Sequence, residues 1–238
     1  MNNSYGTLYL IPTTLGGEIE PLEVLPLSIK RTIEALDYFI VENEKTARRF
    51  IKKISPKKSQ PSLKISLLNK YTEPQQLPIF LTPCLNGHDA GIISEAGCPG
   101  IADPGADVVK IAHEKGIKVV PLVGPSSILM AMMASGMNGQ SFAFNGYLPI
   151  DKADRKQAIK QFEKRAKDYN QAQVFIETPY RNNKLLENFA TTLQPNTRLC
   201  VACDISLPSE FIKTLIASQW GKATLDLHKR PSIFIIQP

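Results

Sequence analysis

Short apolar runs alternate with helical patterns through the first half of this chain, and no other feature constrains its fold more. Helical periodicity is clear in residues 27–35, where Ile29 and Ile33 fall on one face. Strands that are separated by helices pair in parallel through crossover connections, so the alternation predicts a largely parallel sheet. The expected strands are Thr7–Ile11, Tyr38–Val41, Leu63–Leu68, Gly91–Ser94 and Ile117–Val123.

The loop Ser94–Gly105 is the strongest candidate for a ligand-binding segment. Five of its twelve residues are Gly or Pro, and it joins the apolar run Gly91–Ile93 to a helical pattern over Ala106–Lys115. Glycine allows a ligand to approach the backbone closely, and ligands of open α/β sheets bind at the carboxyl ends of strands. An ordinary strand-to-helix connection is the alternative, but such links usually have about two to six residues. The pattern therefore favours a binding loop that carries two acidic side chains, Glu95 and Asp103.

The composition is that of a globular protein with a substantial core. Apolar residues make up 43% of the 238 positions, yet no apolar run approaches the ~20 residues of a membrane helix. Residues 1–5 lack the features of a signal peptide, so we expect a cytoplasmic protein without membrane contact. Cys200 and Cys203 would point to opposite faces of a strand, so we expect no metal site.

Positive charge is concentrated in two segments of the chain, whose net charge is +6. Seven basic and no acidic residues lie between Lys45 and Lys58, a density that attracts polyanions such as nucleic acid. The second segment, 152–167, also places Ile159, Phe162, Ala166 and Tyr169 at helical spacing. An amphipathic helix with a solvated basic face explains that segment.

The second half of the chain predicts a separate, mixed sheet. Gly124-Pro125-Ser126-Ser127 interrupts the first pattern and is suited to begin a helix whose first amides can hold an anion. We expect two α/β domains, residues 1–123 and 124–238, with a hinge near Pro121–Pro125. The strand-like runs of the second domain are Ser141–Phe144, Gln173–Glu177, Leu199–Cys203, Ala223–Leu227 and Ser232–Ile236.

Five ordered segments resemble the tetrapyrrole methylase superfamily of S-adenosylmethionine-dependent methyltransferases. Within it, the likeness is greatest to the small-subunit ribosomal RNA cytidine 2′-O-methyltransferases, and it covers nearly the whole chain. The segments are Leu8–Gly16 (similar to LYxVPTPIGN), Ser94–Gly105 (SDAGTPxxSDPG), Val119–Ser127 (VVPLPGPSA), Gly146–Pro149 (GFLP) and Glu177–Arg181 (ESPHR).

The resemblance implies two α/β domains, S-adenosylmethionine in the cleft between them, and a homodimer. Carried over by motif, the cofactor-binding residues come from three loops of the first half and two positions of the second. They are Leu15, Gly16, Glu95, Gly97, Pro99, Ile101, Ser126, Ser127, Thr178 and Ala202.

Several positions depart from the family pattern. Glu95 replaces an aspartate, and Asn43 replaces the second carboxylate of the family's A-E-D-T-R. The arginine and lysine of A-R-E-L-T-K-x-x-E are missing from Ala202–Glu210, and Lys229–Ser232 replaces K-G-E. These departures concern the acceptor side more than the cofactor.

The resemblance predicts methyl transfer to a ribose 2′-hydroxyl of small-subunit ribosomal RNA. Glu42 and Lys45 match the family's acidic-basic loop and are the candidate catalytic residues on the substrate side. Alternatively, Glu42 only ends a strand and caps a helix or pairs with Arg48. Two other functions remain open at this point: methylation of a tetrapyrrole precursor, and regulation by a cofactor-binding protein with reduced activity.

Overall fold

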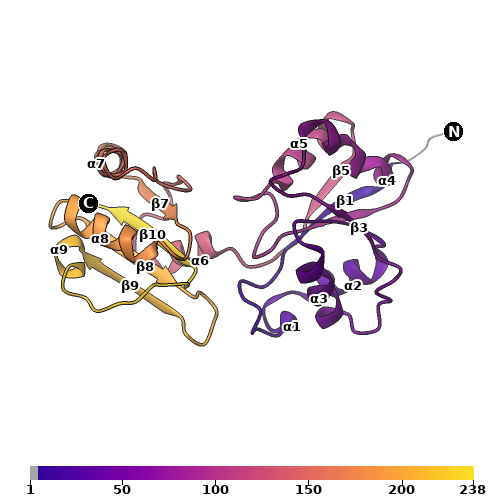
Figure 1. Cartoon of the computed structure of the whole chain (residues 1–238), viewed down its shortest axis with the longest axis horizontal. Coiled ribbons are helices and arrows are strands. Elements are labelled where there is room, and N and C mark those ends of the chain that lie inside the picture. Colours follow the sequence, from indigo (N-terminus) through magenta and orange to yellow (C-terminus); the bar gives the residue numbers. More distant parts are fainter. Residues whose placement is uncertain (1–4) are drawn as a thin grey trace. The chain divides into compact units, whose positions relative to one another are not determined.

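Two five-stranded sheets organise the chain in the computed structural model, which describes residues 5–238 (Figure 1). The chain divides into two compact units, one ending at Ser126 and the other beginning at Ser127. Each sheet belongs to one unit, so the prediction of two α/β folds with separate sheets is confirmed.

The N-terminal sheet is entirely parallel, as the alternating pattern predicts. β1 (Thr7–Ile11) pairs with β4 (Ala90–Ile93) on one side and β5 (Lys118–Pro121) on the other. β4 also pairs with β2 (Tyr38–Val41), and β3 (Lys64–Leu67) forms the edge beyond it. The carboxyl ends of β2, β4 and β1 are therefore neighbours.

Helices cover both faces of this sheet, because successive side chains of each strand enter opposite cores. Ile11 packs in one core with Ile29 and Ile51, whereas Leu8 packs in the other with Val108. The helical elements are α1 (Pro21–Val24), α2 (Leu27–Ala35), α3 (Glu44–Ile54), the 3-10 helix η1 (Pro74–Leu81), α4 (Thr82–Leu85) and α5 (Gly105–Glu114).

The C-terminal sheet is mixed, which confirms the second prediction. Its strands lie in the order β6 (Phe142–Phe144), β7 (Ala172–Ile176), β10 (Ser232–Gln237), β8 (Arg198–Cys203) and β9 (Phe211–Ile216). Only the β6–β7 pair is parallel. The helices of this unit are α6 (Ser127–Ser135), α7 (Lys152–Asp168), α8 (Asn182–Thr192) and α9 (Ala217–Trp220).

One predicted strand and one predicted core residue are wrong. Residues 223–227 form no strand, because Leu227 N donates to Asn183 Oδ1 on α8 and not to a strand. The fifth strand is β9, whose exposed Lys213 is typical of an edge strand and weakens the apolar signal. Tyr169 follows the last residue of α7 and is 72% exposed, whereas Ile159 and Ala166 are buried as expected.

Cys200 and Cys203 are buried free thiols in β8. Within residues 5–238 no three His, Cys, Asp or Glu side chains are grouped closely enough to hold a metal ion. In the same part of the chain, no helix has both the length and the apolar character required to cross a bilayer.

Candidate functional site

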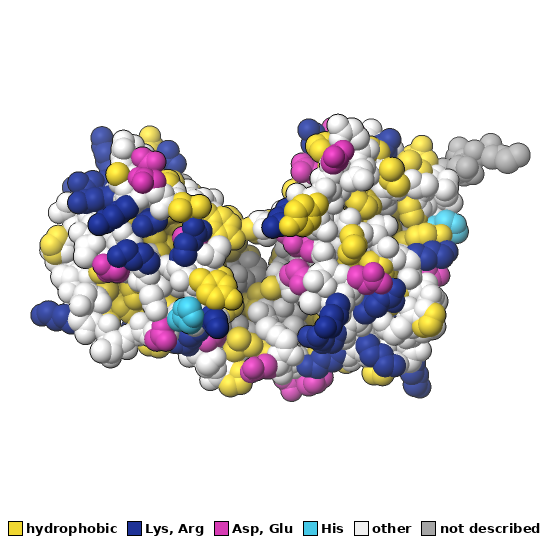
Figure 2. Space-filling model, in the orientation of Figure 1, with side chains coloured by type: hydrophobic (Ala, Val, Ile, Leu, Met, Phe, Trp, Pro, Cys, Tyr) yellow, Lys and Arg dark blue, Asp and Glu magenta, His cyan; other side chains and the backbone are white. Residues whose placement is uncertain are grey.

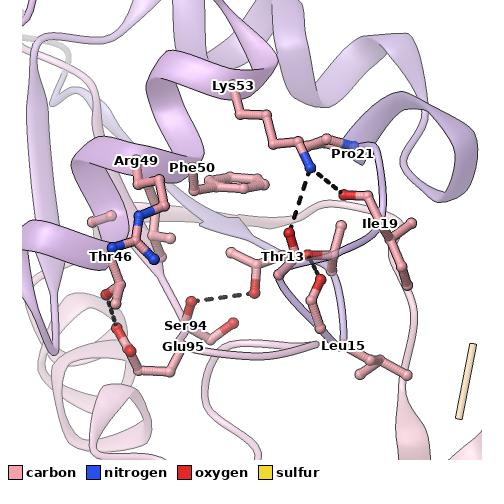
Figure 3. Close-up of a pocket in the computed structure, with 15 residues that line it drawn as sticks. Thr13, Leu15, Ile19, Pro21, Thr46, Arg49, Phe50, Lys53, Ser94 and Glu95 are labelled. Atoms are coloured by element: carbon pink, nitrogen blue, oxygen red, sulfur yellow. Dashed lines mark hydrogen bonds between the residues drawn. The ribbon is translucent and has the colours of Figure 1, made fainter. Parts of the chain in front are cut away.

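Two loops at the carboxyl ends of β1 and β4 are tied together by hydrogen bonds. Thr13 N donates to Gly97 O at 3.0 Å, and Thr13 Oγ1 donates to Ser94 O at 3.3 Å. Ser94 Oγ also donates to Gly97 O at 2.6 Å, which closes the turn of the second loop. The two motifs that the sequence singles out are thus parts of one structure (Figure 3).

A cavity of about 210 Å³ opens beside these loops. Its walls are the loop after β1, the loop after β4 and one face of α3 (Figure 3). Small-molecule sites usually enclose about 300–1,000 Å³, so this cavity has room for only part of a larger ligand. The α3 face consists of Thr46, Arg49, Phe50 and Lys53.

The start of α3 explains one departure from the family pattern. Asn43 is the N-cap, and its Oδ1 accepts from Lys45 N at 2.9 Å and Thr46 N at 3.3 Å. An asparagine caps a helix as well as an aspartate does, without adding a negative charge. The helix start in turn places Thr46, whose hydroxyl donates to Glu95 Oε1 at 2.6 Å. The longer Glu95 side chain therefore connects the β4 loop to α3.

Four of the seven cations in 45–58 have partners within the protein. The ion pairs join Arg48 to Glu44 at 2.7 Å, Lys53 to Glu20 at 3.1 Å and Lys58 to Asp37 at 3.6 Å. Lys52 Nζ donates to Pro56 O at 2.7 Å. Among residues 5–238, Lys45, Arg49 and Lys57 form no ion pair or hydrogen bond through their side chains. Arg49 is the only one of these three that lines the cavity.

Glu42 lies next to Asp103 at the end of β2. The two carboxylates border a separate void of about 10 Å³, roughly the space for one water molecule. Asp103 Oδ1 accepts from Gly100 N at 2.7 Å and Gly105 N at 2.8 Å, so this side chain shapes its own loop. Burial, followed by the charges of Asp103 and Glu95, raises the pKa of Glu42 above its usual range.

Glu42 directly follows the last residue of β2, but neither of the contacts in the alternative prediction is present among the described residues. Arg48 forms its ion pair with Glu44, and Asn43 caps α3, so Glu42 does neither. Among the described residues no side chain or amide is hydrogen-bonded to the Glu42 carboxylate. A half-buried carboxylate with a raised pKa and without such a partner has the properties of a general base.

Gly97 has the backbone conformation that the loop requires of a glycine. Its φ is +72°, in the left-handed region, and a Cβ there would lie 3.2 Å from both Leu15 Cδ2 and Pro125 O. The position therefore leaves no space for a side chain between the β1 loop and the segment after β5. Close backbone approach of this kind is typical of loops that surround a ligand.

The structure places the predicted residues in several groups. Leu15, Gly16 and Glu95 line the cavity, whereas Gly97 is buried beside Leu15 and does not line it. Pro99 is buried further along the same loop, whereas Ile101 is 54% exposed and does not line the cavity. Glu42 and Lys45 flank the start of α3. Ser126 ends the N-terminal unit and Ser127 begins α6; Thr178 follows β7, and Ala202 is buried in β8.

Among the cavity residues that sequence reasoning missed, the polar and aromatic ones on α3 are Thr46, Arg49, Phe50 and Lys53. Their spacing of three, four and seven places them on one face of a helix, a signal that was present in the sequence. This helical spacing is hard to recognise because the same segment contains seven basic residues, whose charge is the more obvious feature.

Two departures in the C-terminal half are joined in the structure. Arg230 Nε lies 2.7 Å from Asp204 Oδ2, and the Asp204 side chain is only 7% exposed. Ser209 Oγ donates to the same oxygen at 2.8 Å. The residues that replace the family's charged motifs therefore form an ion pair of their own that connects the two loops.

Known proteins similar to this chain fall into two groups, although no protein-family model matches it. Ribosomal RNA small subunit methyltransferase I of Buchnera aphidicola is 28% identical over 98% of this chain and 79% of its own length. The protein of that name from Escherichia coli O157:H7 is 25% identical over 99% and 79%. A Streptococcus pyogenes protein of that name is 32% identical over 77% of this chain and 59% of its own length.

Solved structures share the fold at low sequence identity. The methyltransferase CobJ has a TM-score of 0.64 at 14% identity, over 98% of this chain and 94% of that one. Cobalt precorrin-4 methyltransferase CbiF has a TM-score of 0.62 at 11% identity, over 100% of this chain and 97% of that one. A uroporphyrin-III C-methyltransferase from Thermus thermophilus, complexed with S-adenosylhomocysteine, has a TM-score of 0.59 at 15% identity, over 98% of this chain and 97% of that one. The named methyltransferases I confirm the resemblance seen in the sequence motifs, and the solved structures confirm the fold.

Proposed function

We infer that this chain, a homologue of the ribosomal RNA small subunit methyltransferases I with the tetrapyrrole methylase fold, is itself an S-adenosylmethionine-dependent methyltransferase. Its acceptor is a ribose 2′-hydroxyl of small-subunit ribosomal RNA. The observation that carries this conclusion is sequence similarity to the named RNA methyltransferases along almost the entire chain. Enzymes named for tetrapyrrole substrates share the fold at only 11–17% identity, which favours RNA over a tetrapyrrole or a purely regulatory role.

The residues at the site fit the cofactor. The left-handed Gly97 holds the β4 loop close to Leu15 and Pro125, and the cavity combines polar walls with the apolar Leu15 and Phe50. We propose that Leu15, Gly16, Glu95 and Gly97 hold S-adenosylmethionine, which supplies an electrophilic methyl group when bound. The remaining contacts are proposed for Pro99, Ile101, Ser126, Ser127, Thr178 and Ala202.

Glu42 and Lys45 are the proposed catalytic residues. The Glu42 carboxylate accepts the proton that the ribose hydroxyl loses, a role suited to its raised pKa and to its lack of a hydrogen-bonded partner among residues 5–238. Lys45, in the first turn of α3, places an ammonium group near the same end of β2 and stabilises negative charge on the RNA. Alignment of the hydroxyl is the main contribution of the protein to such a displacement.

Arg49 and Lys45 are expected to contact the RNA backbone, because their side chains form no ion pair or hydrogen bond with any other residue in 5–238. Replacing both with alanine should weaken RNA binding and make it less dependent on salt. The logarithm of the RNA association constant decreases linearly with the logarithm of the salt concentration. The magnitude of this slope should become smaller by about 0.7 for each phosphate of single-stranded RNA that the variant no longer neutralises. Fluorescence anisotropy across a salt series measures this. Lys110→Ala, which removes an exposed charge on α5, is the control, and an equal effect there would contradict the assignment.

We also propose that the enzyme is a homodimer that acts in the cytoplasm, where its ribosomal substrate lies. Met133 on α6 is 84% exposed and Leu129, one turn earlier, is 52% exposed, so this helix presents an apolar surface suited to a partner. Met133→Glu is expected to shift the sedimentation coefficient from dimer to monomer. Ile79→Glu, at a 67% exposed position of η1, should leave it unchanged.

Two measurements test the proposed function. Calorimetry with S-adenosylmethionine should show micromolar binding to the purified protein. Mass spectrometry of ribosomal RNA from a strain that lacks the gene should show the loss of one ribose methyl group, restored by the wild-type gene. An unchanged methylation pattern would rule out the proposed acceptor even if the cofactor binds.

A further inference from the structure

Tyr180 is an aromatic side chain held at the surface of the C-terminal unit. It is 70% exposed and lies in the loop after β7, two residues beyond Thr178. Its ring contacts that of His228 at a centroid distance of 5.7 Å and an interplanar angle of 74°. Lys229 Nζ lies 5.9 Å from the Tyr180 ring centroid. Hydrophobic, basic and histidine side chains are all visible on the surface of this unit (Figure 2).

The loop that carries Tyr180 is fixed by hydrogen bonds between the residues that precede and follow it in the chain. Glu177, only 7% exposed, accepts from Thr178 N at 2.7 Å and from Arg181 Nη2 at 2.6 Å. Arg181 N donates to Thr178 O at 2.8 Å. The tyrosine is therefore presented by a rigid turn, so binding a ligand costs little ordering of the backbone.

The segment that carries His228 and Lys229 is attached directly to this turn. Lys229 N donates to Pro179 O at 3.1 Å, and Asn182 Nδ2 donates to Arg230 O at 2.6 Å. Lys229 has a φ of +59°, a left-handed conformation that is unfavourable for a residue with a Cβ. Such strain persists only where the surroundings impose it, and here the neighbouring bonds and the Asp204–Arg230 ion pair do so.

We propose that Tyr180, His228 and Lys229 form a stacking platform for an unpaired base of the RNA substrate. The inference rests on the proposed function and identifies where that substrate is recognised. Proteins read single-stranded RNA by stacking its bases on aromatic rings, with cations near the phosphates. The exposed ring supplies the stacking face, and Lys229 supplies the charge. Among residues 5–238, Lys229 Nζ has no carboxylate partner, whereas the nearby Asp226 accepts from Asn183 Nδ2 and His228 N.

The place of the platform in the chain supports a role in substrate recognition. Tyr180 stands where the family motif ESPHR has histidine, and Lys229 lies in the segment that replaces K-G-E. Both departures thus occur at one surface, where Lys229 N donates to the carbonyl of Pro179, the residue after Thr178, a proposed cofactor contact.

The test compares Tyr180→Ala with Tyr180→Phe as its matched control. The probe is a short, labelled, single-stranded oligocytidylate, with methylation of small-subunit ribosomal RNA measured in parallel. Loss of the ring should weaken oligonucleotide binding by about tenfold or more and raise KM for the RNA, whereas phenylalanine should preserve both. S-adenosylmethionine affinity should stay within about twofold of wild type in both variants, because the ring is assigned to the base and not to the cofactor.

A spectroscopic variant gives a readout that does not depend on turnover. Tyr180→Trp places an indole at the platform, and its fluorescence should be quenched by the oligonucleotide. The single native Trp220 is buried and donates to Leu199 O, so it provides a constant background.

Three results would overturn the platform. Unchanged oligonucleotide affinity and KM in Tyr180→Ala, with an active wild type, would reject it while leaving the proposed function intact. If Tyr180→Ala lost dimerisation but bound RNA normally, the surface around Tyr180 would be assigned to contact with a second copy of this protein. A wild type that methylates no RNA would remove the proposed function, and the platform with it.

Discussion

Glu42→Gln is expected to lower the rate of methyl transfer by about 100-fold or more while leaving S-adenosylmethionine binding intact. The substitution keeps the size of the side chain and removes its ability to accept a proton, a contribution that is typically worth about 10²–10⁴-fold. Single-turnover measurements at saturating cofactor and RNA isolate this step. Glu44→Gln is the matched control: Glu44 is two residues away but its carboxylate is paired with Arg48, so its loss should change the rate less than about twofold.

The pH dependence of the same reaction provides an independent check. Glu42 must be ionised to accept a proton, and its pKa is raised by burial and by the charges of Asp103 and Glu95. Activity should therefore fall on acidification at a higher pH than an ordinary glutamate would cause. Glu95→Gln removes one of those charges, so the acidic limb should move to lower pH when the cofactor is saturating. Full activity in Glu42→Gln, or an acidic limb that it does not alter, would exclude Glu42 as the base.

Gly97→Ala is expected to weaken S-adenosylmethionine binding by about tenfold or more and to destabilise the N-terminal unit. A left-handed alanine costs about 1–2 kcal/mol, and its Cβ would lie 3.2 Å from Leu15 Cδ2 and Pro125 O. The loops that line the cavity must move apart to relieve this crowding, and small displacements of a binding site have large effects. Calorimetry with the cofactor and thermal unfolding measure the two consequences.

Gly116→Ala separates backbone strain from crowding at the site. Gly116 has nearly the same φ, +71°, but no atom lies within 4 Å of the position of its Cβ. It follows α5, away from the cavity, so alanine there should cost about 1 kcal/mol in stability without changing cofactor affinity. Equal losses of affinity in the two variants would show that Gly97 acts only through general stability.

Local pattern was sufficient to predict most of the N-terminal unit. β1, β2 and α2 have the predicted boundaries because each is a short apolar or amphipathic run whose period matches its structure. The C-terminal sheet was less predictable. β9 is an edge strand with a polar, exposed Lys213, and an edge strand is defined by its pairing with β8 more than by its composition.

The parallel and mixed sheets, the glycine- and proline-rich loop after β4, and the family to which the motifs point can all be predicted from the amino-acid sequence. How the polar side chains are used is evident only once the chain is folded. Asn43 caps α3, four of the seven cations in 45–58 are bonded within the protein, and Asp204 pairs with Arg230 across 26 positions. Strands and helices follow from the periodicity of neighbouring residues, whereas hydrogen bonds and ion pairs depend on distances between segments that are far apart in the chain. For the same reason the sequence does not distinguish Glu44, which pairs with Arg48, from Glu42, whose carboxylate has no hydrogen-bonded partner in the described part of the chain.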